Sequence, residues 1–245
     1  MKTVLIQQFL KEHDIDLEQI SLGEFDEIGE ICARKARDKG SPLYKSVGKW
    51  FKPSYERGIL IYSLIKRYKL KSFLEVGFGR GHSAVAAAKA FYDIGIDGKV
   101  TSIDPVFDKN QLELMSQTFP KEWLEKIELK QGYSQEVLKT LDGPFDFVFV
   151  DGDHRAPAVA SDWNMLKDKW NSFLLFDDYH LPTKKEADIE CAQVIDRIDE
   201  TKFDATKTLV KLDRRIFLDD RGYTDEMVDY GMVVLQKNSL TKEEW

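Results

Sequence analysis

The chain has few of the residues that hold small secreted domains or metal clusters together. Its 245 residues include two cysteines, Cys32 and Cys191. Two are too few for a disulfide framework or a thiolate metal cluster, so we expect buried thiols in a reducing compartment. The chain starts MKTVLIQQFLKEHD, with a single lysine before a short apolar run and no small-residue cleavage site. We therefore predict no signal peptide.

Long apolar runs and excess positive charge are also missing. No stretch of roughly 18 apolar residues occurs, so we expect no membrane contact and a cytoplasmic protein. The net charge of −7 argues against nucleic acid as a partner. Residues 33–72 differ, because they carry twelve Lys and Arg against Asp38 and Glu56. They form either solvated helix surfaces or a basic docking face for an anionic partner, and a homo-oligomer stays open.

Short apolar runs alternate with helical patterns from residue 70 onward, which indicates βαβ units and a parallel sheet. The runs VFV and FLLF are almost continuously apolar, as expected for strands covered on both faces. The last two runs have no strong helix between them and predict an antiparallel hairpin at one sheet edge. Strands are predicted at 72–77, 99–104, 126–132, 145–151, 172–177, 206–212 and 231–237.

These patterns predict a Rossmann-like, doubly wound α/β fold. Its sheet is mostly parallel and seven-stranded, with an antiparallel edge strand. Helical patterns cover residues 5–14, 22–40 and 53–70. We therefore divide the chain into an N-terminal helical cap, residues 1–70, and a sheet domain, residues 71–245.

A glycine loop, LEVGFGRGHS, follows the first strand of the predicted sheet domain. Ligands of parallel sheets bind at the carboxyl ends of the strands, where Gly77, Gly79 and Gly81 lie. A dinucleotide loop would place its third glycine at position 82, which is His82. The second strand ends at Asp104, whose carboxylate can accept both hydroxyls of a ribose. A bare turn and a helix cap are the plain alternatives, but together the two features predict a nucleoside ligand.

Acidic side chains follow two further strands, in FVFVDGDH and FLLFDDYH. Because these strands are predicted neighbours, Asp151, Asp177 and Asp178 converge near the nucleoside site. Carboxylates this close repel one another unless protons or a cation intervene, and oxygen ligands suit Mg²⁺. A helix-capping role is the plain alternative for Asp153 and His154, and we expect Tyr179 to be a packing residue.

The glycine loop and Asp104 resemble the class I S-adenosylmethionine (SAM)-dependent methyltransferases. The stretch Glu75–Gly81 is similar to the family's first motif, which lies against the methionine and ribose of the cofactor. The resemblance implies that Asp104 takes the ribose hydroxyls and that residues 131–134 line the adenine. The cofactor-binding residues implied are Glu75, Gly77, Gly79, Gly81, Asp104, Gly132, Ser134 and Asp151.

The pair DGDH and DDYH resembles the cation-dependent small-molecule O-methyltransferases. The resemblance implies that Asp151, Asp177 and Asp178 bind Mg²⁺ or another divalent cation, which holds the substrate hydroxyl. It also nominates His180 as the base and Asp151 as a second catalytic residue. The catechol-methylating branch usually has Asn at the third ligand position, and Asp178 departs from this pattern.

The function implied is SAM-dependent methyl transfer to a hydroxyl of a small molecule, with help from a divalent metal. The glycine spacing disfavours one alternative, an NAD-dependent oxidoreductase. A non-catalytic nucleoside-binding module with a basic partner-docking cap stays open as the other.

Overall fold

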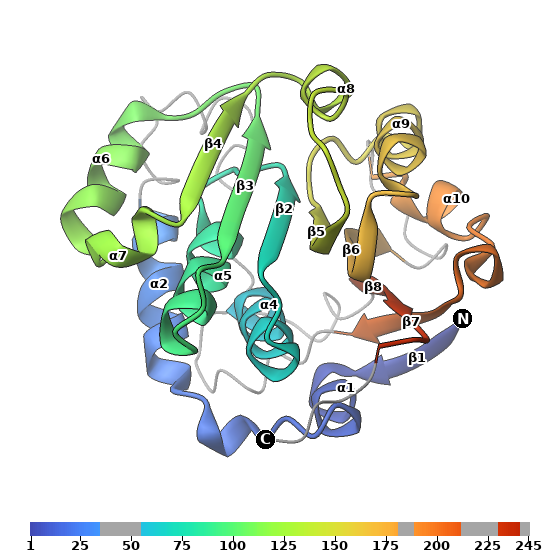
Figure 1. The fold of residues 1–245 in the computed structure, drawn as a ribbon, viewed down its shortest axis with the longest axis horizontal. Helices are drawn as coiled ribbons and strands as arrows, with labels where there is room; N and C mark the ends of the chain where they lie inside the picture. The colour runs from blue at the N-terminus through green and yellow to red at the C-terminus, as the bar shows by residue number, and fades with distance from the viewer. Residues whose placement is uncertain (35–54, 181–188, 212–229, 241–245) are drawn as a thin grey trace.

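A computed structural model describes residues 1–34, 55–180, 189–211 and 230–240. Their centre is an eight-stranded sheet with the order β1-β7-β8-β6-β5-β2-β3-β4 (Figure 1). The strands are β1 (Lys2–Leu5), β2 (Ser72–Val76), β3 (Lys99–Asp104), β4 (Ile127–Gln131), β5 (Phe145–Val150), β6 (Trp170–His180), β7 (Ala205–Lys211) and β8 (Tyr230–Lys237). All pairs are parallel except those that β8 makes with β6 and β7.

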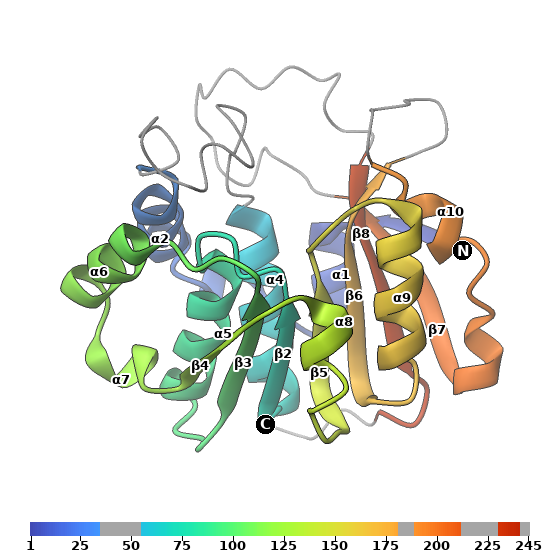
Figure 2. The same ribbon diagram turned by 90° about the horizontal axis from the view of Figure 1, so that it is seen from above.

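Helices cover both faces of the sheet (Figure 2). One group contains α1, α2, α4 and α5, and α8, α9 and α10 form the other. The bounds are α1 (Ile6–Glu12), α2 (Leu22–Arg34), α4 (Tyr55–Tyr68), α5 (His82–Asp93), α6 (Lys109–Thr118), α7 (Lys121–Leu124), α8 (Ser134–Val137), α9 (Ala156–Leu166) and α10 (Cys191–Ile195). Short 3-10 turns lie at Leu17–Gln19 and Glu200–Phe203.

The central strands alternate between two hydrophobic clusters. Phe73 on β2 and Phe147 on β5 belong to the cluster shared with α1, α4 and α5. Their chain neighbours Leu74 and Val148 belong to the cluster on the other face, beneath α9 and α10. Successive strand residues point to opposite faces. The predicted covering of both faces is therefore confirmed.

The fold class and the antiparallel pairing of the last two strands are confirmed, but the described residues form eight strands, not seven. The additional strand, β1, pairs in parallel with β7 and lies outside it. The hairpin of β7 and β8 is therefore one strand away from the edge. Only Val4 of β1 is buried. A strand this short, with a single buried side chain, carries no periodicity of its own in the sequence.

The three helices predicted between residues 1 and 70 are present as α1, α2 and α4 in the part of the chain that is described. Residues of these helices share one buried cluster with the sheet, including Leu10, Phe25 and Leu64. Residues 35–54, most of the basic stretch in the segment 33–72, lie outside the described residues. Among the described helices, none has the length and apolarity needed to cross a membrane.

Candidate active site

The register of four neighbouring strands brings the sequence-predicted residues to one edge of the sheet. Val76 of β2 pairs with Ile103 of β3 and with Val150 of β5. Val150 in turn pairs with Phe176 of β6. The residues that follow these positions are Gly77, Asp104, Asp151 and Asp177. The glycine loop, the predicted ribose carboxylate and the acidic cluster therefore share the carboxyl edge of the sheet, as predicted.

Asp104 and the glycine loop are in direct contact. The amide of Gly79 donates to Asp104 Oδ2 at 3.1 Å, and the amide of Val106 donates to Oδ1 at 2.9 Å. Each carboxylate oxygen can accept a further hydrogen bond. Burial raises the pKa of Asp104, while the backbone donors oppose this shift. The carboxylate can therefore still accept from a ligand.

At two positions of the loop the absence of a side chain matters, for different reasons. Gly77 has φ of +96°, and a Cβ there would lie 2.1 Å from the carbonyl oxygen of Asp151. Gly79 has φ of +52°, but a Cβ there would meet nothing within 4 Å. Gly77 thus permits close contact between the β2 and β5 ends. Gly79 leaves open space beside Asp104, where a ligand can approach the backbone.

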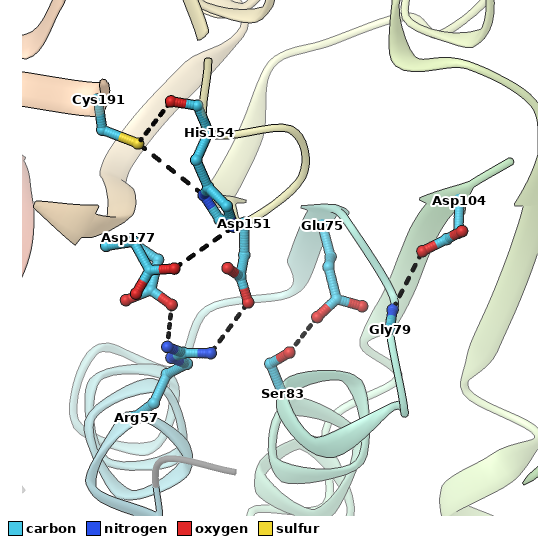
Figure 3. Close-up of polar contacts among 10 residues, drawn as sticks. Arg57, Glu75, Gly79, Ser83, Asp104, Asp151, His154, Asp177 and Cys191 are labelled. Carbon is cyan, nitrogen blue, oxygen red and sulfur yellow. Dashed lines mark hydrogen bonds and ion pairs between the residues drawn. The ribbon is translucent and has the colours of Figure 1, made fainter. Parts of the chain in front are cut away.

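Glu75 lies beneath the loop and is completely buried. Ser102 donates to its Oε2 at 2.6 Å, as expected from the pairing of Glu75 with Ser102 between β2 and β3. Ser83, at the start of α5, donates to the other oxygen (Figure 3). Burial raises the pKa of Glu75 to about 7. In this structure the carboxylate ties β2, β3 and α5 together, and its predicted cofactor contact stays a prediction.

The loop is also fixed by Arg80, which the sequence reasoning did not select. Its side chain is 1% exposed, and its Nε donates to the carbonyl of Cys32 in α2. Its Nη2 donates to Gln111 of α6 at 3.0 Å, and Gln111 returns a bond to the Arg80 carbonyl. The sequence signal that could have identified Arg80 is the position of a long, charged side chain between two glycines of the loop. These bonds hold the loop against two helices.

The predicted adenine segment lies next to Asp104. The amide of Gly132 donates to the Asp104 carbonyl at 3.0 Å, and Gly132 has φ of +152°. Ser134 donates its hydroxyl to Asp162 of α9 at 2.6 Å. Asp162 is 1% exposed, and burial raises its pKa to about 6. Ser134 thus holds a buried carboxylate, and its role toward a cofactor is not tested.

The acidic cluster contains a cation from the protein itself. Arg57, near the start of α4, donates from Nη1 to Asp151 Oδ2 at 2.9 Å. Its Nη2 forms an ion pair with Asp177, so that one guanidinium bridges two strand ends (Figure 3). The Asp177 side chain is fully buried. The sequence placed Arg57 among basic helix residues, and only the position of α4 brings it here.

A second set of side chains could hold a metal ion. Ligand atoms of Asp151, His154 and Asp178 all lie within 4.8 Å of one another. His154 Nε2 is 3.4 Å from Asp178 Oδ2. A register shift in β6 between Phe176 and Tyr179, with φ of +50° at Asp178, turns this part of the strand. Carboxylates and imidazole are ordinary ligands of divalent metals, so these residues fit such an ion.

Neither Asp153 nor His154 occupies the helix-cap position that the sequence left open to them. The cap position of α9 is Arg155, whose own side chain makes no capping hydrogen bond, and the amide of Ala156 donates to the Glu190 carboxylate at 2.9 Å. Asp153 instead binds its neighbour, since its carboxylate accepts from the amide of Arg155 at 3.0 Å and from the guanidinium. The His154 ring faces Asp178, and Cys191 Sγ lies 3.9 Å from its Nδ1.

The protonation of the acidic cluster is shifted by its surroundings. Burial raises the pKa of Asp151 to about 7, with Arg57 opposing the shift and Asp178 adding to it. Burial also raises the pKa of Asp177 well above its ordinary value, against the same opposition from Arg57. One guanidinium therefore does not fully compensate the carboxylates gathered here, and the site favours additional positive charge.

Two predictions concern the end of β6. Tyr179 packs as predicted, with 4% exposure and its hydroxyl donating to Asp196 at 2.8 Å. His180 is the last residue of β6, pairs with Tyr230 in the sheet and is described in its backbone only. Its assignment as a base stays a prediction.

Comparisons with known proteins agree with this geometry. Residues 74–179 match a family model described as a methyltransferase domain. The match covers less than half of the chain. Over 107 residues the chain is 33% identical to caffeoyl-CoA O-methyltransferase 2 of Petunia hybrida and to caffeoyl-CoA O-methyltransferase 1 of Nicotiana tabacum. The petunia match covers 41% of this chain and 42% of the relative, so the chain spans less than half the length of the curated relatives it matches.

Solved structures share the fold over more of the chain. The O-methyltransferase TomG of Streptomyces achromogenes, solved with SAM, has a TM-score of 0.58 at 17% identity and covers 89% of this chain and 91% of its own. An O-methyltransferase of Bacillus cereus in complex with S-adenosylhomocysteine (SAH) has a TM-score of 0.57 at 14% identity and covers 94% and 96%. The predicted class I methyltransferase fold is confirmed.

Proposed function

We propose that this protein is a SAM-dependent O-methyltransferase that acts on a hydroxyl of a small molecule with the help of a divalent cation. The observation that carries this proposal is the contact between Gly79 and Asp104 beside the acidic cluster. This contact would place the proposed nucleoside site, at the ends of β2 and β3, next to the proposed cation site at β5 and β6. The methyltransferase domain match and the caffeoyl-CoA O-methyltransferase relatives support it.

The residues present suit SAM as the cofactor. Asp104 would accept the ribose hydroxyls with the free lone pairs of its carboxylate. The open space at Gly79 would let the ligand lie against the backbone, and the turn at Gly132 would lie along the adenine. Bound SAM supplies an electrophilic methyl group. The protein then has to bring an acceptor oxygen into line with that methyl and remove its proton.

A divalent cation would be held by Asp151 and Asp178, with His154 as a nitrogen ligand and Asp177 behind them. When bound, such an ion lowers the pKa of a coordinated hydroxyl. His180 would take the proton, because an imidazole titrates near neutral pH. Asp151 would hold the acceptor end of the site at the correct distance from the glycine loop. A cytoplasmic location and any assembly of identical chains stay predictions.

The oxidoreductase alternative is not favoured. The third glycine is Gly81, one residue earlier than in a dinucleotide loop, and the relatives found are methyltransferases. A non-catalytic docking role would depend on the basic segment 33–72, of which residues 35–54 lie outside the described part.

The test is methyl transfer from tritiated SAM to a panel of hydroxyl acceptors that includes caffeoyl-CoA and simple catechols. We expect transfer to at least one acceptor, loss of transfer with EDTA and loss of transfer in Asp151→Asn. Asp153→Asn is the matched control, because this carboxylate binds only its neighbour Arg155 among the contacts described. Transfer that Asp151→Asn leaves intact would contradict the assigned role of Asp151.

A further inference from the structure

Arg57 places a permanent positive charge inside the proposed cation site. It extends from the first turn of α4 to the ends of β5 and β6, where it contacts both Asp151 and Asp177. Its side chain is 17% exposed, and its guanidinium carbon lies 5.9 Å from the centre of the Phe149 ring. Arginine stays protonated at all physiological pH values. The acidic cluster therefore holds one cation that cannot be titrated away.

Asp151 is shared between this guanidinium and the candidate metal ligands. Its Oδ2 accepts from Arg57 at 2.9 Å, and the same carboxylate belongs to the set with His154 and Asp178. A divalent ion bound to Asp151 would lie within a few ångströms of the guanidinium. Two cations at that separation repel each other strongly in a partly buried site. Metal and guanidinium therefore compete for one carboxylate.

Asp177 would keep its ion pair with Arg57 when a metal ion binds to Asp151. Its side chain is fully buried, and a buried carboxylate without a cation is costly. Arg57 can give up Asp151, which is 19% exposed, and still neutralise Asp177. The fork of the guanidinium has separate donors for the two carboxylates, so one bond can break while the other stays. Competition thus falls on Asp151.

We propose that Arg57 is a resident cation that competes with the divalent metal for Asp151 and thereby sets the metal affinity of the site. The proposal rests on the proposed function only in taking this cluster as the metal site. It makes Arg57 a positioning residue, which acts on the metal through Asp151. Removal of its charge should therefore tighten metal binding, although the protein loses two ion pairs.

Calorimetric titration of the full chain with Mn²⁺ at pH 8 tests this proposal. We expect Arg57→Met to bind Mn²⁺ at least tenfold more tightly than the wild type, and Arg57→Lys, which keeps the charge, to gain less. Arg67→Met is the matched control, because Arg67 lies on the same helix, is buried and pairs with Asp14 away from the site. It should bind Mn²⁺ as the wild type does.

Unchanged or weaker Mn²⁺ binding in Arg57→Met, or no binding in either protein, overturns the proposal. If Arg57→Met does not fold, an NMR titration of the wild-type protein tests the proposal instead. Titration with diamagnetic Mg²⁺ should shift the Arg57 Nε–H signal in a ¹⁵N spectrum, assigned by its loss in Arg57→Lys, and an unmoved signal overturns the competition. SAH binding is measured on the same samples. Its absence contradicts the proposed function without touching the comparison of metal affinities.

Discussion

The buried Glu75 permits a quantitative test of how the strand ends are held together. It has no exposed surface, and its pKa is about 7, raised by burial from the ordinary value of 4.5. Between these two pH values the folded protein binds more protons at this position than the unfolded chain. The free energy of unfolding therefore falls as the pH rises through this window, and the full loss is present above pH 7.

Glu75→Gln removes this titration and keeps an acceptor oxygen for one of the two serines, while the hydroxyl of the other can accept from the new amide. A shift of this size corresponds to about 3 kcal/mol at most, of which ~2 kcal/mol or slightly more develops between pH 5 and pH 8. The variant should therefore become more stable relative to the wild type by about that amount as the pH rises over this range. The sign is unusual, because removal of a carboxylate stabilises the protein at alkaline pH.

Urea unfolding followed by tryptophan fluorescence at pH 5, 6, 7 and 8 measures the difference. Glu128→Gln is the control, because Glu128 is partly exposed and hydrogen bonds from Lys130 and Lys99 lower its pKa. Its contribution to stability is lost only at acidic pH, so its difference from the wild type should stay flat from pH 5 to pH 8. A flat difference for Glu75→Gln as well would refute the reasoning that Glu75 is a strained, desolvated carboxylate.

Three further substitutions separate the roles of the site residues. Gly77→Ala should lower the free energy of unfolding, measured in urea, by more than about 2 kcal/mol. The reason is that alanine would strain the backbone there and clash with the Asp151 carbonyl. Gly79→Ala should cost about 1 kcal/mol in the same assay but weaken SAH binding, because its Cβ enters open space next to Asp104. Asp104→Asn should raise the SAH dissociation constant at least tenfold in calorimetry, since hydrogen bonds to a charged group contribute roughly 1.5–3 kcal/mol. Equal stability of the two alanine variants, or unchanged SAH binding in Asp104→Asn, would contradict these roles.

Much of the fold could be predicted because the central strands have a clear local sequence pattern. The runs FVFV and FLLF are continuous in apolar residues, and an aspartate follows each of them at the carboxyl edge. Strand β1 could not be found in this way. Lys2–Leu5 gains its partner, β7, from a segment some 200 residues later in the chain. Its pairing is a tertiary contact, and local patterns do not report such contacts.

The candidate site was predictable in its carboxylates but not in its cation or its imidazole. Asp104, Asp151 and Asp177 lie at or directly after the ends of apolar runs, so the strand pattern alone places them at one edge. Arg57 reaches the cluster only because α4 packs on α5, and no periodicity of the helix reveals this. His154 faces Asp178 only because β6 shifts register there. The positions of side chains that helix packing or a bulge brings to the site follow from the tertiary structure and not from local sequence patterns.

The account depends most directly on the ligand that lies beside Gly79 and Asp104. Calorimetric titration of the full chain with SAH, and separately with NADH, measures this. We predict that SAH binds with one molecule per chain and that NADH produces no binding heat. Saturable binding of NADH without binding of SAH would contradict the central claim.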